Sequence, residues 1–145
     1  REKASFLSEN LLPLEESGQL RFIDRNGRWN REPFGERFPG LDIFFADGHT
    51  ESQMLPVVSY RGTRVAYMAD LTPAAAHLPM AWVIGYDTRP LLTMEEKALL
   101  LEQAHQEDWM LFFEHDAANA CCRLESTEKG IRATGLAPSF EEAWG

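Results

Sequence analysis

Three residues of the kinds that bind metal ions each follow an apolar run in the sequence. His49 comes after "LDIFFADG", Asp70 after "RVAYMA" and His115 after "WMLFFE". Histidine and aspartate are usual ligands of zinc, and of iron or manganese, and the two oxygens of an aspartate can bridge two ions. If the runs are neighbouring core strands, the three side chains lie at one edge of a sheet, where rigid strand ends hold them in place. The pattern predicts part of a metal site, and the interpretation as ordinary polar residues at strand ends stays open because spacing does not give strand order.

The sequence around these residues supplies the strands that such a site needs. Residues 55–70, "LPVVSYRGTRVAYMAD", indicate two strands joined by a tight hairpin turn at Arg61-Gly62. The second of these runs, Val65 to Met68, is apolar on both faces, which is typical of a central buried strand. Residues 121–135 indicate another pair of strands around Glu128-Lys129-Gly130. Further strands are expected at residues 19–24, 41–48 and 109–116, and a buried strand or extended segment at 81–87.

Two helices are expected between and before the strands. Residues 1–16 have apolar residues near helical spacing, and Gly18 is suited to end that helix. Thr93 followed by Glu96 has the pattern of a capping box, which predicts a helix from Met94 to about Gln106. Because strands come first and strand–helix–strand alternation follows, the order predicts an α+β fold, a mixed β-sheet covered by helices.

Length, charge and composition limit the classes of function. The 145 residues are enough for a single domain, 1–145, and the net charge of −9 argues against nucleic acid as a partner. The arginine-rich stretch 21–37 also contains acidic residues and is expected to be a solvated loop. No apolar run approaches the roughly 18 residues of a membrane span. The adjacent Cys121 and Cys122 are expected to face opposite sides of a strand in a reducing compartment, which favours a cytoplasmic protein.

Two long stretches, "ADGHTESQMLPVVSYRGTRVAYMADLTP" and "YDTRPLLTMEEKALLLEQAHQEDWMLFFEHD", resemble the C-terminal half of the metallo-β-lactamase fold superfamily of metallo-hydrolases. In that family a Gly-His-Thr turn carries one metal ligand, an Asp after an apolar strand bridges two ions, and a later strand ends in the last histidine. His49, Asp70 and His115 stand at these positions. The sequence departs from the family in two ways. No second glycine follows the Gly-His-Thr turn, and the His-x-His-x-Asp-His string is absent. The resemblance covers about residues 20–130 and implies half of an αββα sandwich.

The resemblance implies a metal-dependent hydrolase. In the complete protein two zinc ions, or iron or manganese in their place, would activate a hydroxide that attacks an ester, thioester, lactam or phosphoester of a small-molecule substrate. Asp70 would bridge the ions and belong to the catalytic centre. Because this chain offers only part of the ligand set, the resemblance implies an incomplete site, a chain that is inactive by itself, and a partner. That partner would be a missing N-terminal half or, in a homo-oligomer, a second copy. The alternative is a metal-free scaffold or interaction module with the same fold.

Residues near the expected site each have two interpretations. His77 would contact substrate or relay a proton at the mouth of the family's cleft, which makes it a candidate catalytic residue, or it is an ordinary loop histidine. Tyr86 and Asp87 either orient a ligand histidine or mark the turn after a strand. Asp116 either supports His115 or caps the following loop.

Overall fold

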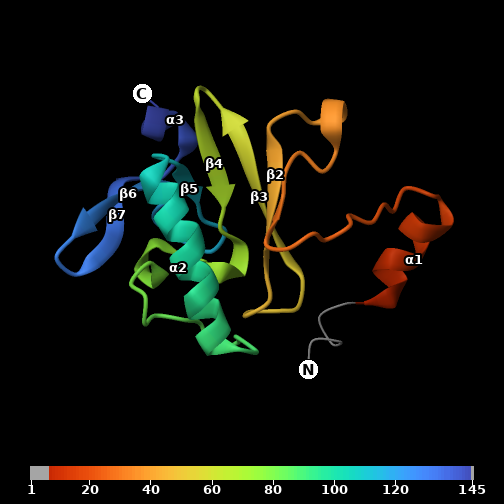
Figure 1. Ribbon diagram of the computed structural model, residues 1–145, viewed down its shortest axis with the longest axis horizontal. Coiled ribbons are helices and arrows are strands. Elements are labelled where there is room, and N and C mark those ends of the chain that lie inside the picture. The colour runs from red at the N-terminus through yellow and green to blue at the C-terminus, as the bar shows by residue number, and fades with distance from the viewer. Residues whose placement is uncertain (1–6, 145) are drawn as a thin grey trace.

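The computed structural model describes residues 7–144, which form a seven-stranded sheet with two of the three α-helices packed against it (Figure 1). The strands lie in the sheet in the order in which they occur in the sequence. Neighbouring strands are antiparallel except for β4 and β5, which run parallel, so the predicted mixed α+β sheet is confirmed. The strands are β1 (Trp29–Asn30), β2 (Leu41–Ala46), β3 (Gln53–Tyr60), β4 (Thr63–Tyr67), β5 (Met110–Phe112), β6 (Cys121–Thr127) and β7 (Gly130–Ala137).

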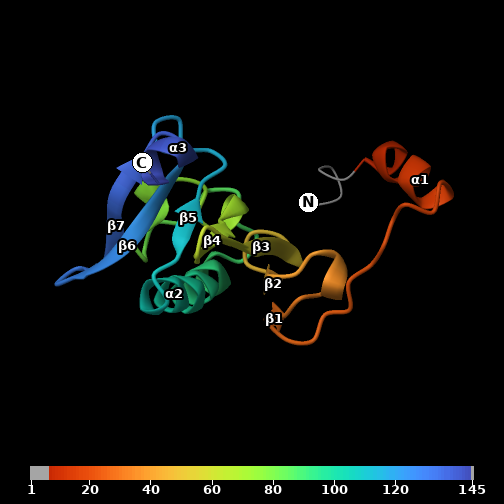
Figure 2. The same cartoon turned by 90° about the horizontal axis from the view of Figure 1, so that it is seen from above.

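The helices α2 and α3 lie on opposite sides of the sheet, as the view from above shows (Figure 2). The helix α2 is long and precedes β5, whereas α3 is a short helix that follows β7. No helix of residues 7–144 combines the length and the apolar character that crossing a membrane requires. The helical segments are α1 (Ser8–Glu16), α2 (Pro90–Gln106) and α3 (Phe140–Trp144), with the short 3-10 turns η2 (Gly35–Arg37), η3 (Ala69–Leu71) and η4 (Ala75–His77).

The predicted hairpin turn joins β3 to β4. Tyr60 pairs with Thr63, and the two residues between them, Arg61 and Gly62, have φ angles of 47° and 82°. Positive φ at both central positions is the geometry of the type I′ turn, which matches the twist of the flanking strands. The strand β4 pairs with β3 on one side and β5 on the other, so the prediction of a central strand is also confirmed.

The main core fills the space between the sheet and α2. Alternate residues of the strands point to this side because successive side chains of a strand face opposite ways. The helix contributes Leu101 and Ala104, both fully buried, as is typical of the core-facing side of a surface helix. The sheet contributes a set of fully buried side chains that includes Phe44, Leu55, Val57, Ala66, Leu111 and Cys122.

A smaller apolar cluster covers part of the other side of the sheet. Val65, Met110 and Cys121 lie there beneath the aromatic rings of Phe140 and Trp144 from the α3 segment. Cys121 thus lies on the side opposite to Cys122, as the sequence predicts, and both thiols are free and buried.

Two of the predicted strands are wrong. Residues 19–24 and 81–87 form no strand, and both segments carry exposed aromatic side chains, Phe22 at 88% and Tyr86 at 80% exposed. An extended segment becomes a strand only where a neighbour supplies the partners of its backbone groups. Residues 81–87 instead form turns, one of them closed by the hydrogen bond from Asp87 N to Ile84 O at 3.1 Å.

The capping-box prediction is also wrong. The helix α2 begins at Pro90 rather than at Met94, because proline at the first helical position has the required φ and lacks only an N–H that would stay unpaired. Thr93 lies inside the helix, where its hydroxyl donates to Arg89 O at 3.4 Å. Glu96 therefore cannot cap this helix and reaches across to the turn after β2 instead.

The helix predicted over residues 1–16 is present as α1 from Ser8 onward, while residues 1–6 lie outside the described part of the chain. Gly18, with φ of 68°, follows the end of the helix as predicted. None of the α1 residues is buried, and the helix lies apart from the sheet in both Figures 1 and 2.

Candidate metal centre

Sheet topology brings the three predicted ligand residues to one edge of the sheet. The strands β2 and β4 are both antiparallel to β3, and β5 is parallel to β4, so β2, β4 and β5 all end at this edge. His49 lies three residues beyond the end of β2, Asp70 three beyond β4 and His115 three beyond β5. The order of the strands in the sheet therefore places these side chains together. This order could not be read from the spacing of the three residues along the sequence.

The carboxylate of Asp70 lies between the two histidines. Its Oδ2 atom is 3.5 Å from Nε2 of His49, and its Oδ1 atom is 3.4 Å from Nε2 of His115. The three side chains are 34%, 18% and 57% exposed, in the order Asp70, His49, His115, so solvent reaches the group. Each histidine therefore faces a different oxygen of the same carboxylate.

This geometry does not make a complete metal site. Within residues 7–144, no group of three or more His, Cys, Asp or Glu side chains is arranged to hold a metal ion by itself. The two contacts of Asp70 use different oxygens of its carboxylate, Oδ2 toward His49 and Oδ1 toward His115. Their role as metal ligands stays a prediction.

The imidazole of His49 is oriented by a buried carboxylate. Its Nδ1 atom lies 3.0 Å from Oδ1 of Asp87, whose side chain is only 1% exposed. A carboxylate accepts a hydrogen bond and cannot donate one, so Nδ1 donates to Asp87, and this contact turns the Nε2 edge of the ring toward Asp70. Of the two interpretations of Asp87, orientation of a ligand histidine is therefore the one that the geometry favours.

His115 is less constrained, and Asp116 does not orient it. The carboxylate of Asp116 accepts hydrogen bonds from the backbone N–H groups of Ala75, Ala118 and Asn119. Burial raises the pKa of Asp116, but these backbone donors outweigh burial and leave the pKa below its usual value. Asp116 thus caps the loop before β6, which is the second of its two interpretations. It also connects that loop to η4.

His77 and Tyr86 are not drawn into the group. No hydrogen bond or ion pair within residues 7–144 joins the His77 side chain to Asp70, and its Nδ1 atom is buried without a partner. Tyr86 is 80% exposed, so of its two interpretations the turn is the one that fits. A catalytic role for His77 stays a prediction.

A buried lysine holds the loop that carries His77. Lys97 is fully buried in α2, and its ammonium donates to the backbone oxygens of His77, Pro79 and Trp82 at 3.0, 3.1 and 2.7 Å. Burial lowers the pKa of Lys97 to about 8, although the negative charge of Asp87 opposes this change. Lys97 is not recognisable from sequence, because a Glu-Lys pair in a helix usually lies on a solvated face.

No protein-family profile and no curated protein sequence matches this chain significantly. Several solved structures do resemble it in three dimensions. A probable metal-dependent hydrolase from Staphylococcus aureus aligns with a TM-score of 0.63 at 22% identity and covers 72% of this chain. AidC, a dizinc quorum-quenching lactonase, aligns with a TM-score of 0.64 at 20% identity over 91% of this chain. AbOPH, a hydrolase of the β-lactamase superfamily, aligns with a TM-score of 0.65 at 11% identity over 90%.

These similarities show that the chain has the fold of part of these hydrolases, in agreement with the resemblance in sequence to one half of the metallo-β-lactamase fold. The chain spans only part of each of those proteins, 37% of the first and 42% of each of the other two. At such low identity the similarity concerns the fold, and the chemistry has to be argued from the residues of this chain.

Proposed function

We propose that this chain supplies His49, Asp70 and His115 to a two-metal centre of a hydrolase with the metallo-β-lactamase fold. The observation that carries the proposal is that the two oxygens of Asp70 face the Nε2 atoms of two different histidines. One carboxylate shared between two nitrogen donors suits two ions held side by side. The remaining ligands then come from outside these 145 residues, in keeping with the 37–42% of the solved structures that the chain spans.

The donor atoms fit zinc. Imidazole nitrogen and carboxylate oxygen are both common zinc ligands, and iron or manganese would accept the same set. Because Nδ1 of His49 donates to Asp87, Nε2 is the ring nitrogen that would bind a metal, and a metal-ligating histidine typically donates its other N–H to such a carboxylate. Two bound ions would supply a water of lowered pKa and stabilise the oxygens of the transition state.

The reaction class that follows is hydrolysis of an ester, thioester, lactam or phosphoester in a small molecule. The chain's own contribution is to hold its three donors at fixed points on the edge of a rigid sheet. The AidC lactonase, a dizinc enzyme with this fold, supports a carboxylic ester among these substrates.

Metal analysis of the full-length protein that contains this chain, purified without chelator, tests the proposal. We expect close to two zinc, iron or manganese ions per molecule, loss of both on Asp70→Asn, and loss of about one on His49→Ala or His115→Ala. The control is His105→Ala, since His105 lies on α2 away from the strand ends. If the full-length protein bound no metal, or if Asp70→Asn kept its full metal content, the proposal would fail and the metal-free scaffold would be the better account.

A further inference from the structure

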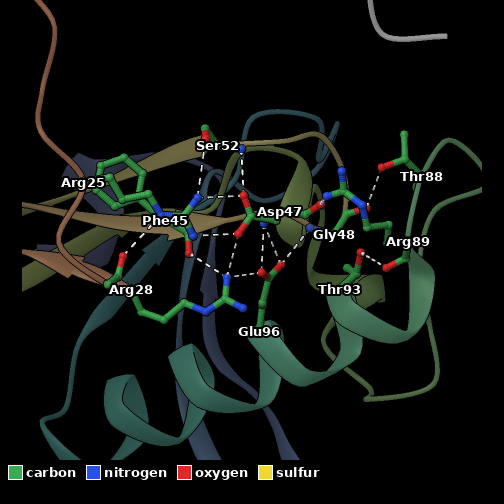
Figure 3. A network of polar contacts seen from close by, with 11 residues as sticks. Arg25, Arg28, Phe45, Asp47, Gly48, Ser52, Thr88, Arg89, Thr93 and Glu96 are labelled. Atoms are coloured by element: carbon green, nitrogen blue, oxygen red, sulfur yellow. Dashed lines mark hydrogen bonds and ion pairs between the residues drawn. The ribbon is translucent and has the colours of Figure 1, made fainter.

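Glu96 is the most deeply buried carboxylate of the described residues, and both of its oxygens are used. Its side chain is 0% exposed in the second turn of α2. The Oε1 atom accepts from Asp47 N at 2.8 Å, and the Oε2 atom accepts from Gly48 N at 2.9 Å (Figure 3). Arg28 forms an ion pair with the same carboxylate and so balances its buried charge. The two N–H groups that Glu96 binds belong to the residues directly before His49.

The carbonyl groups of the same turn are held from the other side. Gly48 O accepts from Arg89 N at 2.8 Å and from the Thr88 hydroxyl at 3.2 Å. His49 O accepts from Thr88 N at 3.2 Å, and the Arg89 side chain donates to Asp47 O. The start of α2 and the loop before it therefore bind the backbone of residues 47–49 at nearly every polar group (Figure 3).

Close packing removes the remaining freedom of the turn. A Cβ atom placed on Gly48 would lie 2.6 Å from the Cα atom of Thr93, so the turn touches the backbone of α2 directly. Arg25 forms an ion pair with Asp47 at 2.6 Å, and Ser52 N donates to the same carboxylate at 2.8 Å.

We propose that Glu96 is a positioning residue of the candidate metal centre, which fixes the turn at residues 47–49 so that Nε2 of His49 faces Asp70. The inference rests on the proposed function, because positioning has a purpose only if His49 binds a metal. His49 follows directly on the two N–H groups that Glu96 binds, and a turn that is free to shift would carry the imidazole away from a carboxylate now 3.5 Å distant.

A purely structural role is the competing explanation, in which Glu96 only ties α2 to the sheet. The two explanations differ in what happens to His49 while the protein is still folded. If Glu96 only stabilises the fold, its replacement lowers the free energy of unfolding and leaves the His49 ring unchanged. If Glu96 positions the turn, replacement also changes the hydrogen bond between His49 and Asp87 and the affinity for metal.

The test uses Glu96→Gln in the full-length protein, because glutamine has nearly the same size but can accept with only one of its two terminal atoms. Glu95→Gln, one residue away and exposed on α2, is the matched control, and Asp87→Asn shows how the His49 signals move when the ring loses its partner. Ring nitrogen shifts of ¹⁵N-labelled histidine, read in metal-free protein, report the tautomer of His49. Zinc affinity is measured by chelator competition.

We expect Glu96→Gln to shift the His49 ring signals toward a mixture of tautomers and to lower zinc affinity about 10-fold, with Glu95→Gln unchanged in both. Folded Glu96→Gln protein with unchanged His49 signals would overturn the inference. If that variant does not fold, Glu96→Asp keeps the charge, withdraws the carboxylate by one methylene and answers the same question. If the unaltered protein binds no zinc, the proposed function fails, while the His49 signals of the metal-free protein still decide whether Glu96 positions the ring.

Discussion

His49 and Asp87 are joined at 3.0 Å, through Nδ1 of the imidazole and an oxygen of a carboxylate that is 1% exposed. In this pairing Nδ1 donates to the carboxylate, and the ring is oriented so that Nε2 faces Asp70. Residues 81–87, which the sequence predicted as a strand, are thus a loop, and its last residue, Asp87, orients the His49 ring.

Replacing Asp87 by asparagine tests this contact. Asparagine keeps the size but removes the charge that stabilises the N–H donor, so we expect zinc affinity of the full-length protein to fall roughly 10- to 100-fold. The ring nitrogen signals of His49 should change at the same time. The control is Asp108→Asn, whose carboxylate is 78% exposed, and unchanged His49 signals in Asp87→Asn would contradict the assignment.

The tight approach of Gly48 to α2 gives a second prediction. In Gly48→Ala the new methyl group meets backbone atoms of Thr93, which cannot move aside as a flexible side chain would. We expect the free energy of unfolding to fall by about 3 kcal/mol or more, measured by urea denaturation. Gly85→Ala is the matched control, since nothing lies within 4 Å of a Cβ at that position, and its effect should stay within about 0.5 kcal/mol. Equal effects of the two substitutions would show that the turn and the helix are not packed together.

The buried ammonium of Lys97 predicts a dependence of stability on alkaline pH. Burial lowers the pKa of this lysine to about 8 from its ordinary 10.5, so the folded state releases the proton at lower pH than the unfolded chain does. Between these two values unfolding takes up a proton, and the contribution of Lys97 to the free energy of unfolding therefore rises with pH. The rise is at most about 1.4 kcal/mol per pH unit.

Comparison with Lys97→Met isolates this effect, because the titration of tyrosine and cysteine groups occurs in both proteins and cancels. We expect the stability difference to change in favour of the unaltered protein as pH increases from 8 toward 10.5. Urea denaturation at several pH values measures it. A difference that stays constant across this range would mean that Lys97 keeps an ordinary pKa in the folded protein.

The burial of the Cys122 side chain can be tested by the reactivity of its thiol. Burial raises the pKa of Cys122 to about 12, and the thiolate is the reactive form of a cysteine. At pH 8 the thiolate fraction of Cys122 is then lower by roughly a factor of a thousand than for a thiol of ordinary pKa. In Cys121→Ser, which leaves Cys122 alone, an aromatic disulfide reagent should react slowly with native protein and rapidly in concentrated urea. Rapid, complete reaction of the native protein would contradict the burial of this side chain.

The hairpin at Arg61-Gly62 and the buried strand that follows it could be predicted from sequence because both depend on local rules. A two-residue turn with positive φ and an apolar run on both faces are properties of neighbouring residues. The candidate ligands were recognisable for the same reason, since each follows a core run within a few residues. Residues 19–24 and 81–87 satisfied the local rules as well, but no strand lies beside them to pair with their backbone.

The grouping of His49, Asp70 and His115 was decided by the tertiary structure alone. It depends on β2, β4 and β5 ending at one edge of the sheet, and this follows from strand pairings between residues far apart in the sequence. The support from Glu96 likewise joins residues 47 and 96, which no local pattern connects. Local sequence is enough to identify the segments apolar enough to be buried and the residues that could bind a metal. Only the folded chain decided which of them meet, because the free energy of burial selects a packing of the whole sheet and helix, and side-chain contacts follow from that packing.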